Sequence, residues 1–375
     1  MEYERRDAYD ALSVPVYNTL DYEFDNAAVM AEAFTDKIKA PDYSRVENPT
    51  VTNLERRVAA LTDAAHATAF NSGMAAISNT LMALAAQGKN IVTSKHLFGN
   101  TYALLVATLR RFGVKVRLRD LTNIEAVREA IDDDTCCVFL EILTNPQLEV
   151  ADLKAISEVA HEKNVPLVVD STVIPFTQFS AKSLGVDIEV VSSSKYVSGG
   201  ATSLGGLVID YGTPYNGDFA KRLYGEMLFN FGAYMTPQVA YMQTIGLETL
   251  DARYRVQSSN ALELAKKLRS LPQIKYVNYV GLEDNPYHEL AQRQFGKTAG
   301  AMICIDLESK DIVELMKRTF QFIADFEGEI PGQAAKDCGN YLLHDLPMAK
   351  YEARKYLDEV LCCIREENLI YPTQD

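Results

Sequence analysis

Residues 50–210 alternate between helix-like and strand-like hydrophobic patterns, and no other feature of the sequence limits the fold as strongly. In the helix-like segments apolar residues recur every three or four positions, whereas in the strand-like segments they alternate or run together between turn residues. The helix-like segments are 53–65, 100–113, 123–132 and 150–164, and the strand-like segments are 88–94, 114–120, 135–143, 165–170, 188–195 and 203–210. Strands separated by helices of this length predict an α/β fold with a mostly parallel, doubly wound sheet.

The rest of the chain indicates two further parts. Residues 236–271 predict a long helix, and strands are expected at 274–280 and 300–307, with helices after residue 310. The first 45 residues show little periodicity, so we expect an extended arm that contacts a neighbouring subunit. The predicted division is an N-terminal arm (1–45), a large α/β domain (46–245) and a smaller α+β C-terminal domain (246–375, atypical after about 308).

The charge and the terminal residues argue against several classes of protein. The chain carries 51 acidic and 37 basic residues, a net charge of −14, which argues against nucleic acid or an anionic membrane as the main partner. No apolar run approaches the roughly 18 residues that span a bilayer, and the N-terminal residues lack the apolar core of a signal peptide. We therefore expect a cytoplasmic protein. The six cysteines and five histidines show no metal-ligand spacing, so no metal is expected.

Two polar residues follow or end neighbouring predicted strands, where ligands bind in sheets of this kind. Asp170 ends "VPLVVD", and Lys195 lies in "VVSSSKYVSGG". A lysine amine can condense with an aldehyde to form a Schiff base, and an aspartate can hold a proton on a pyridine nitrogen. Together they favour pyridoxal phosphate as the cofactor. Taken singly, Lys195 would more often be a solvated surface residue, and Asp170 could be the N-cap of a following helix.

The same region offers groups that can bind a phosphate. Ser192 and Ser194 place hydroxyls on either side of the lysine. The turn "NSGMAA" (71–76) precedes a predicted helix, whose first N–H groups attract anions. A nucleotide-binding P-loop is not indicated, because the lysine precedes the glycines instead of following them.

With these residues, eight segments in order resemble the Cys/Met-metabolism family of fold-type-I pyridoxal-phosphate enzymes. They are "YSRVENPT" (43–50), "FNSGMAA" (70–76), "LFGNTYALL" (97–105), "EILTNPQLEVADL" (141–153), "LVVDSTV" (167–173), "SSSKYVSGG" (192–200), "GLETLDARYRVQSSNALELA" (246–265) and "GLEDNPYHELA" (281–291). The resemblance implies the aspartate-aminotransferase-like fold of that family. It also implies an enzyme of sulfur amino-acid metabolism that takes a small amino-acid substrate.

The resemblance implies roles for the residues around the cofactor ring. Lys195 would hold the cofactor as a Schiff base and move protons, and Asp170 would pair with the pyridine nitrogen. Phe98 would stack on the ring, Thr172 would lie beside it, and Asn145 would face its phenolic oxygen.

The family resemblance further implies how the phosphate of the cofactor is bound and how the subunits are arranged. Gly73 and Met74 would bind the phosphate through their backbone N–H groups, together with Ser192 and Ser194. Tyr43 and Arg45 would reach the phosphate of the neighbouring subunit's cofactor, so that the protein is a tetramer built from two dimers with shared active sites. The substrate would contact Tyr43 and Asn145.

Phe98 departs from the tyrosine that the family usually has at the stacking position. A phenylalanine ring can still stack, but it cannot donate a proton to a leaving group. A departing thiolate benefits from such an acid, whereas acetate or succinate leaves readily without one. Phe98, and Asn100 where methionine γ-lyases generally carry cysteine, therefore favour γ-replacement of an O-acyl-homoserine by sulfide or a thiol. A methionine γ-lyase or a cystathionine lyase or synthase is the alternative.

The tail after "AGAMICIDLE" lacks the block that binds the substrate carboxylate in the family. Arg365, in "CCIREEN", is the nearest candidate in chain position for substrate binding, although an arginine in such a segment is more often a solvated helix residue. A further alternative is therefore a paralogue that binds pyridoxal phosphate but is catalytically impaired.

Overall fold

The computed structural model describes residues 11–35, 37–38, 40–200, 202–272 and 274–307. Its chain separates into two compact units. The first contains the described residues of Met1–Lys95, Asn100–Glu141 and Leu153–Leu250, and the second those of His96–Gly99, Ile142–Asp152 and Asp251–Asp375. This grouping does not test the predicted division at residues 45 and 245, which stays a prediction.

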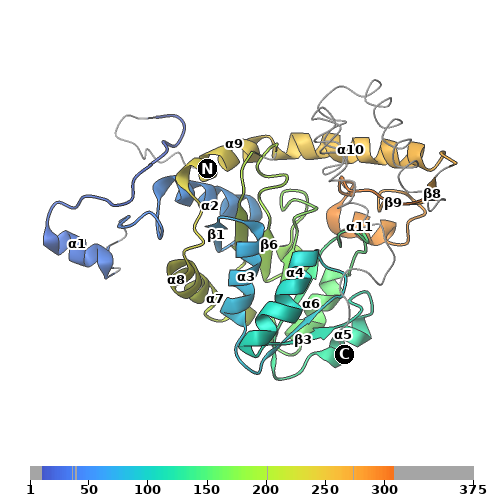
Figure 1. Cartoon of the computed structure of the whole chain (residues 1–375), viewed down its shortest axis with the longest axis horizontal. Helices are drawn as coiled ribbons and strands as arrows, with labels where there is room; N and C mark the ends of the chain where they lie inside the picture. Colours follow the sequence, from blue (N-terminus) through green and yellow to red (C-terminus); the bar gives the residue numbers. More distant parts are fainter. Residues whose placement is uncertain (1–10, 36, 39, 201, 273, 308–375) are drawn as a thin grey trace. The chain divides into compact units, whose positions relative to one another are not determined.

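The first unit is built on a seven-stranded sheet in the order β1-β7-β6-β5-β4-β2-β3 (Figure 1). The strands are β1 (His66–Phe70), β2 (Asn90–Thr93), β3 (Lys115–Leu118), β4 (Thr135–Glu141), β5 (Leu167–Asp170), β6 (Ile188–Val191) and β7 (Gly206–Asp210). All neighbouring pairs are parallel except those of β7, which runs antiparallel to both β1 and β6. The prediction of a mostly parallel α/β sheet is confirmed.

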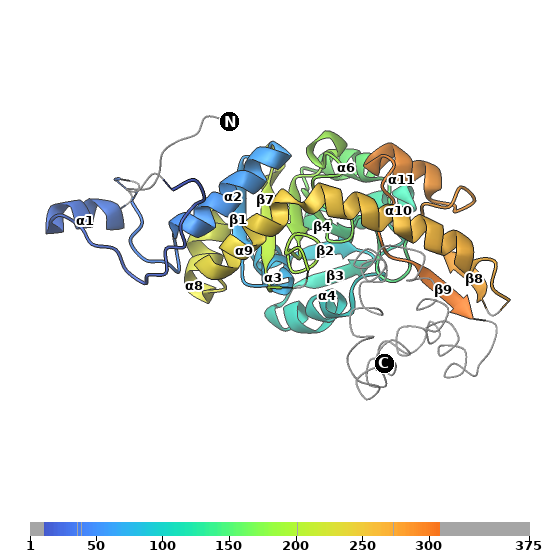
Figure 2. The ribbon, with the colours of Figure 1, turned by 90° about the horizontal axis from the view of Figure 1, so that it is seen from above.

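Helices cover both faces of this sheet. The helices before residue 250 are α1 (Ala27–Phe34), α2 (Pro49–Thr62), α3 (Gly73–Leu84), α4 (Gly99–Ala103), α5 (Ile124–Ala130), α6 (Leu153–His161), α7 (Phe219–Arg222), α8 (Phe229–Phe231) and α9 (Pro237–Glu248), of which α1 lies away from the sheet. Figure 2 shows α2 and α6 on one face and α3 and α4 on the other. All four residues of β5 and all four of β6 are buried, which explains their nearly continuous apolar runs. None of the described helices is both long and apolar enough to cross a membrane.

Three predicted segments differ in detail from the structure. The single long helix expected at 236–271 is divided at Thr249 into α9 and α10 (Leu250–Leu268). The helix expected at 100–113 is α4 followed by a π-helical turn (Leu104–Thr108) and a 3-10 turn (Leu109–Phe112), and it ends before Gly113, whose φ of 79° requires glycine. The arm expected to be extended contains the short helix α1, whose N-cap is Asn26. The Asn26 side chain accepts the N–H groups of Ala28 and Val29, a capping signal that the apolar pattern did not reveal.

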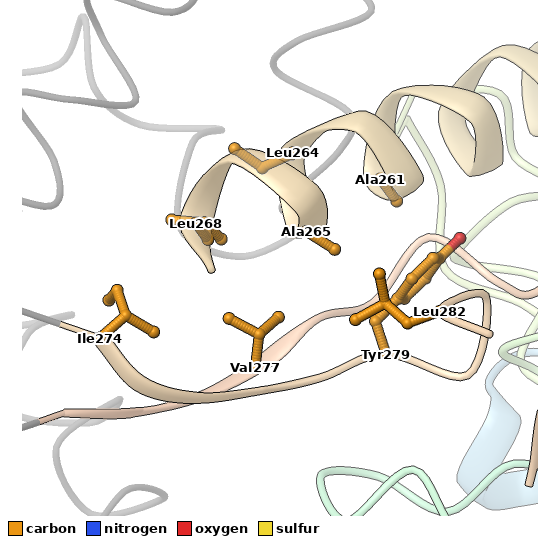
Figure 3. Packing of buried hydrophobic residues seen from close by; sticks show 8 residues of the cluster. All are labelled: Ala261, Leu264, Ala265, Leu268, Ile274, Val277, Tyr279 and Leu282. Atoms are coloured by element: carbon orange, nitrogen blue, oxygen red, sulfur yellow. The ribbon is translucent and has the colours of Figure 1, made fainter. Parts of the chain in front are cut away.

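The second unit has its own small core. It contains α10 (Leu250–Leu268) from Asp251 on, α11 (His288–Phe295) and the antiparallel pair β8 (Ile274–Asn278) and β9 (Cys304–Leu307). In Figure 3, Ala261, Leu264, Ala265 and Leu268 of α10 face the apolar side chains of β8 and of the turn after it. The ring of Tyr279 is buried there, and its hydroxyl donates to the carbonyl oxygens of Ser258 (3.1 Å) and Gly300 (2.9 Å). The strands expected at 274–280 and 300–307 are therefore present.

Candidate active site

The carboxyl ends of β5 and β6 lie side by side, because Asp170 is the register partner of Val190. The Asp170 carboxylate accepts the N–H of Thr172 (2.9 Å), and the Thr172 hydroxyl accepts the N–H of Ser192 (2.8 Å). Thr172 thus ties the residue after β6 to the carboxylate that ends β5. A turn, and not a helix, follows Asp170, so its carboxylate is not a helix N-cap.

The Asp170 side chain is suited to receive a cationic group. The residue is only 9% exposed, and burial raises the pKa of its carboxyl group above the usual range. Within the described ranges, no lysine, arginine or histidine forms an ion pair with it. A protonated pyridine nitrogen would supply the missing positive charge and return the pKa of the carboxyl group toward its ordinary value.

Lys195 follows β6 in a tight turn. Its N–H donates to the carbonyl oxygen of Ser192 (3.3 Å), and the N–H of Ser198 donates to that of Ser193 (2.9 Å). The lysine is exposed on the unit, yet the surrounding atoms remove enough water to lower the pKa of its amine. A lowered pKa increases the fraction of uncharged amine, which is the form that attacks an aldehyde.

The N-terminus of α3 lies against the turn that carries Lys195. The Ser72 side chain caps this helix by accepting the N–H of Ala75 (3.1 Å), while the N–H groups of Gly73 and Met74 donate to no described atom. A Cβ on Gly73 would lie 2.5 Å from the Cβ of Ser192 and 2.8 Å from its hydroxyl oxygen. Two backbone N–H groups and one hydroxyl therefore share a small space at the positive end of a helix, which fits a phosphate.

The Ser194 hydroxyl is used differently from that of Ser192. It donates to the carbonyl oxygen of Gly205 (3.1 Å) and accepts the Gly205 N–H (2.9 Å). Because a hydroxyl has one proton, Ser194 can donate to a phosphate only if its bond to the Gly205 carbonyl breaks. The predicted role of Ser194 as a phosphate donor stays a prediction, and the geometry around Ser192 supports that residue better.

We expect Gly73→Ala to weaken binding of pyridoxal phosphate by about tenfold or more, because the added methyl group would push α3 away from Ser192. The measurement is a fluorescence titration of the cofactor-free protein with pyridoxal phosphate. Gly225→Ala is the matched control, since a Cβ at Gly225 meets nothing within 4 Å. Equal affinities of the two variants would contradict the placement of the phosphate at α3.

Tyr43 and Arg45 lie in the first unit, at the end of the predicted arm (1–45). The Arg45 guanidinium lies over the rings of Tyr43 (5.1 Å) and Phe229 (5.4 Å) and donates to the Phe229 carbonyl oxygen. Within one chain, Arg45 is therefore held by aromatic faces and a backbone carbonyl. Its predicted contact with the neighbouring subunit's cofactor stays a prediction.

Phe98 and Asn145 belong to the second unit. The Phe98 side chain is 47% exposed, so part of its ring surface is accessible. Asn145 precedes a cis proline, Pro146, in a loop that is closed by hydrogen bonds between Thr144 and Glu149. Arg365 lies outside the described residues.

A link between these two loops is absent from the sequence-based prediction. His96 Nδ1 lies 2.6 Å from Glu149 Oε2, which joins the loop of Phe98 to the loop of Asn145. The two residues are 53 positions apart, so no local pattern could pair them, although each lies in or beside one of the quoted motifs. This bond holds the two predicted cofactor-contacting loops together within their unit.

These observations fit pyridoxal phosphate. Lys195 has a lowered amine pKa, Asp170 is a buried carboxylate that pairs with no described cation, and the start of α3 offers donors for a phosphate. The first unit therefore contains groups suited to the aldehyde, the ring nitrogen and the phosphate of the cofactor.

Two family models match the chain. Residues 1–327 match the Cys/Met metabolism PLP-dependent enzyme family. Residues 296–367 are similar to S-ribosylhomocysteinase (LuxS), and this stretch includes most of the tail that lacks the carboxylate-binding block. The two matches overlap over residues 296–327.

Individual proteins agree with the first match. An L-methionine γ-lyase of Fusobacterium nucleatum is 37% identical over 306 residues, which cover 81% of this chain and 76% of that protein. An O-acetylhomoserine sulfhydrylase of Wolinella succinogenes is 43% identical, with a TM-score of 0.66 over 71% of this chain and 82% of that one.

A crystal structure from Campylobacter jejuni, described as an O-acetylhomoserine (thiol)-lyase, is 32% identical with a TM-score of 0.79, covering 83% of this chain and 84% of that one. It contains N'-pyridoxyl-lysine-5'-monophosphate, which is a lysine joined to the cofactor. The matched family model covers most of the sequence, and the mostly parallel α/β sheet agrees with it. The chain belongs to the Cys/Met metabolism family of PLP-dependent enzymes, as its sequence motifs predicted.

Proposed function

We propose that the protein is a PLP-dependent O-acyl-homoserine sulfhydrylase. The observation that carries this choice is Phe98, a stacking side chain without an acidic proton. Expulsion of a thiolate from methionine or cystathionine is helped by a proton donor, whereas an acyl group leaves as a stable carboxylate. The similarity to proteins named O-acetylhomoserine sulfhydrylase supports the same choice.

The reaction exchanges one bond at the γ-carbon of the substrate. The bond between this carbon and the acyloxy oxygen breaks, a bond to the sulfur of sulfide or a thiol forms, and the products are a carboxylic acid and homocysteine or methionine. Bound pyridoxal phosphate supplies an electron sink for the substrate's carbon atoms. Lys195 would take the α-proton as an uncharged amine, and Asp170 would keep the ring nitrogen protonated through its negative charge.

We expect the purified protein to form homocysteine from O-acetylhomoserine and sulfide, with little keto acid. Phe98→Tyr should raise release of α-ketobutyrate from methionine by about tenfold or more, because the added phenol can protonate the departing thiolate. Formation of homocysteine from O-acetylhomoserine should change much less in this variant. Mass spectrometry measures α-ketobutyrate in the reaction with methionine and homocysteine in the reaction with O-acetylhomoserine and sulfide.

Phe112→Tyr is the matched control, since this exposed ring lies in the first unit, outside the loop of Phe98. The second candidate function is a methionine γ-lyase, favoured by the 37% identity to such a protein. Rapid keto acid release from methionine by the unmodified protein would support that candidate. Cofactor binding without turnover of any of these amino acids would support the impaired paralogue, in which the tail and Arg365 do not replace the missing carboxylate site.

The oligomeric state and location belong to the proposal too. A tetramer of two dimers would bring Tyr43 and Arg45 of one subunit to the active site of its neighbour, where the guanidinium fork suits a phosphate. Arg45 could exchange its present carbonyl partner, Phe229, for that phosphate. Light scattering on the purified protein measures the subunit number. We place the protein in the cytoplasm, in keeping with its membership of a family of amino-acid-metabolising enzymes.

A further inference from the structure

A buried carboxyl group without an assigned role lies in the strand next to β5, on the face of the sheet opposite the predicted cofactor partner Asp170. Glu189, in β6, is 0% exposed. The hydroxyl of Ser171 donates to Glu189 Oε1, and the hydroxyl of Tyr211 donates to Oε2 (2.7 Å). Each carboxyl oxygen therefore has one hydroxyl partner, and no described cation forms an ion pair with Glu189.

The strand register places Glu189 on the opposite face of the sheet from Asp170. Asp170 pairs with Val190, whereas Glu189 pairs with Val169, so the two carboxylates point to different faces. Ser171 directly follows Asp170 in the chain and turns its hydroxyl to Glu189. Glu189 thus holds the residue between Asp170 and Thr172, the two positions predicted to contact the cofactor ring.

The charge of Glu189 changes near neutral pH. Burial raises the pKa of its carboxyl group to about 7, the hydrogen bonds from Ser171 and Tyr211 oppose this rise, and the charge of Asp170 adds to it. Since a charge on Asp170 acts on Glu189, a charge on Glu189 must act equally on Asp170.

The other titratable groups around β6 are few. Asp187, two positions before Glu189, pairs with His161 of α6 at 2.8 Å. On the β7 side, Asp210 accepts the side-chain amide of Asn216 (2.7 Å), and burial raises the pKa of the Tyr211 hydroxyl above its usual range. Helix α3, which packs against β6, carries no charged residue.

We propose that Glu189 is a positioning residue of the active site. It acts on the cofactor through its hydrogen bond with Ser171 and through its negative charge on the face of the sheet opposite Asp170. The inference rests on the proposed pairing of Asp170 with the cofactor's ring nitrogen. When Glu189 is ionised, it adds negative charge near Asp170 and strengthens the hold on a protonated ring nitrogen. When Glu189 is protonated, it can donate to Ser171 and this additional charge is lost.

The decisive experiment compares the affinity for pyridoxal phosphate of the unmodified protein and of Glu189→Gln at two pH values. At pH 6 the two affinities should agree, because a protonated glutamate and a glutamine are both neutral and similar in shape. At pH 8 the variant should bind the cofactor about threefold to tenfold more weakly, because only the unmodified protein gains the charge. A role in packing alone would lower the affinity equally at both pH values, and that result would overturn the proposal.

Two further variants test the assignment. Tyr211→Phe removes a hydrogen bond that favours the ionised form, so it should move the pH-dependent gain in affinity to higher pH. Glu55→Gln is the matched control, because burial also raises the pKa of this carboxyl group, to about 8. The Glu55 carboxylate accepts the N–H of Ala69 (2.8 Å) in β1 and so lies in a different hydrogen-bond network. If Glu55→Gln weakened the binding of pyridoxal phosphate at pH 8 as much as Glu189→Gln does, the effect would be a general one of charge, and the proposal would be overturned.

A readout without cofactor separates this inference from the proposed function. Infrared difference spectra of the cofactor-free protein should show a protonated carboxyl band that titrates near pH 7 and is lost in Glu189→Gln but kept in Glu55→Gln. Absence of that band in the unmodified protein would refute the proposal, whatever the protein catalyses. If the band is present but pyridoxal phosphate does not bind, the proposed function and the action of Glu189 on the cofactor both fall.

Discussion

Lys195→Ala is expected to abolish covalent attachment of pyridoxal phosphate and to lower turnover by about three orders of magnitude or more. The amine of Lys195 is the only group proposed here both to bind the aldehyde and to move the substrate's proton, so no neighbour can replace it in both tasks. After borohydride reduction, mass spectrometry of the unmodified protein should show one cofactor attached per chain at this lysine. The variant should show none.

The fold should survive this substitution. The Lys195 amine is partly desolvated, which lowers its pKa. Removal of the side chain therefore relieves the free-energy cost of desolvating the amine and does not open a packed core. Lys182→Ala is the control: this lysine pairs with Asp63 at 2.6 Å on the surface of the same unit, where an ion pair contributes little. Attachment of the cofactor in Lys195→Ala, or its loss in Lys182→Ala, would contradict the assignment.

Asp170→Asn is expected to lower turnover by about a hundredfold while leaving the fold intact. The asparagine oxygen can still accept the N–H of Thr172, so the turn after β5 keeps its hydrogen bond. The negative charge is lost, however, and a neutral amide cannot keep the ring nitrogen protonated. The absorbance of the bound cofactor and the kcat for homocysteine formation are the measurements.

The pH dependence of stability gives an independent check on Asp170. Because burial raises the pKa of this carboxyl group in the folded state, the group costs stability progressively as the pH rises from its unfolded pKa through the folded one. The cofactor-free Asp170→Asn variant escapes this cost, so at pH 7 its Tm should equal or exceed that of the unmodified protein. A clear fall in Tm would instead mean that the carboxylate has a stabilising partner in the fold.

Asp187→Asn is the contrasting control at the other end of the same sheet. Asp187 is fully buried just before β6, and it accepts the N–H of Leu167 (2.7 Å) and contacts His161 (2.8 Å). Loss of its charge should lower the Tm without changing the absorbance of the bound cofactor. The two aspartates thus separate a structural carboxylate from one proposed to act on the cofactor.

The main elements of the sheet could be predicted because their signals are local. Strands β2 to β7 and the helices between them have apolar periods that a short window detects, and their order implies a parallel sheet. Strand β1 escaped detection, since "HATAF" is rich in small residues and pairs with β7, which lies far along the chain. The antiparallel direction of β7 was missed for the same reason: strand direction depends on a partner that the window does not contain.

The candidate site was predictable to a similar degree. Lys195 and Asp170 could be placed because each lies at or just beyond the end of a predicted strand, and the turn before α3 carries an N-cap residue and a glycine. The pairing of Ser194 with Gly205 could not be foreseen, nor could the link between His96 and Glu149, because each depends on how distant segments fold against one another.

By itself the sequence determined the α/β pattern, the family and the identity of the residues expected to meet pyridoxal phosphate, because strand ends, helix starts and motifs are written in consecutive residues. Only the tertiary structure decided the state of each group. Among the described residues it left the Asp170 carboxylate without an ion-pair partner, lowered the pKa of the Lys195 amine and placed Glu189 on the opposite face of the sheet with two hydroxyl partners. Desolvation and hydrogen bonding are set by neighbours in space, and the partners of Glu189, Ser171 and Tyr211, follow two other strands, β5 and β7.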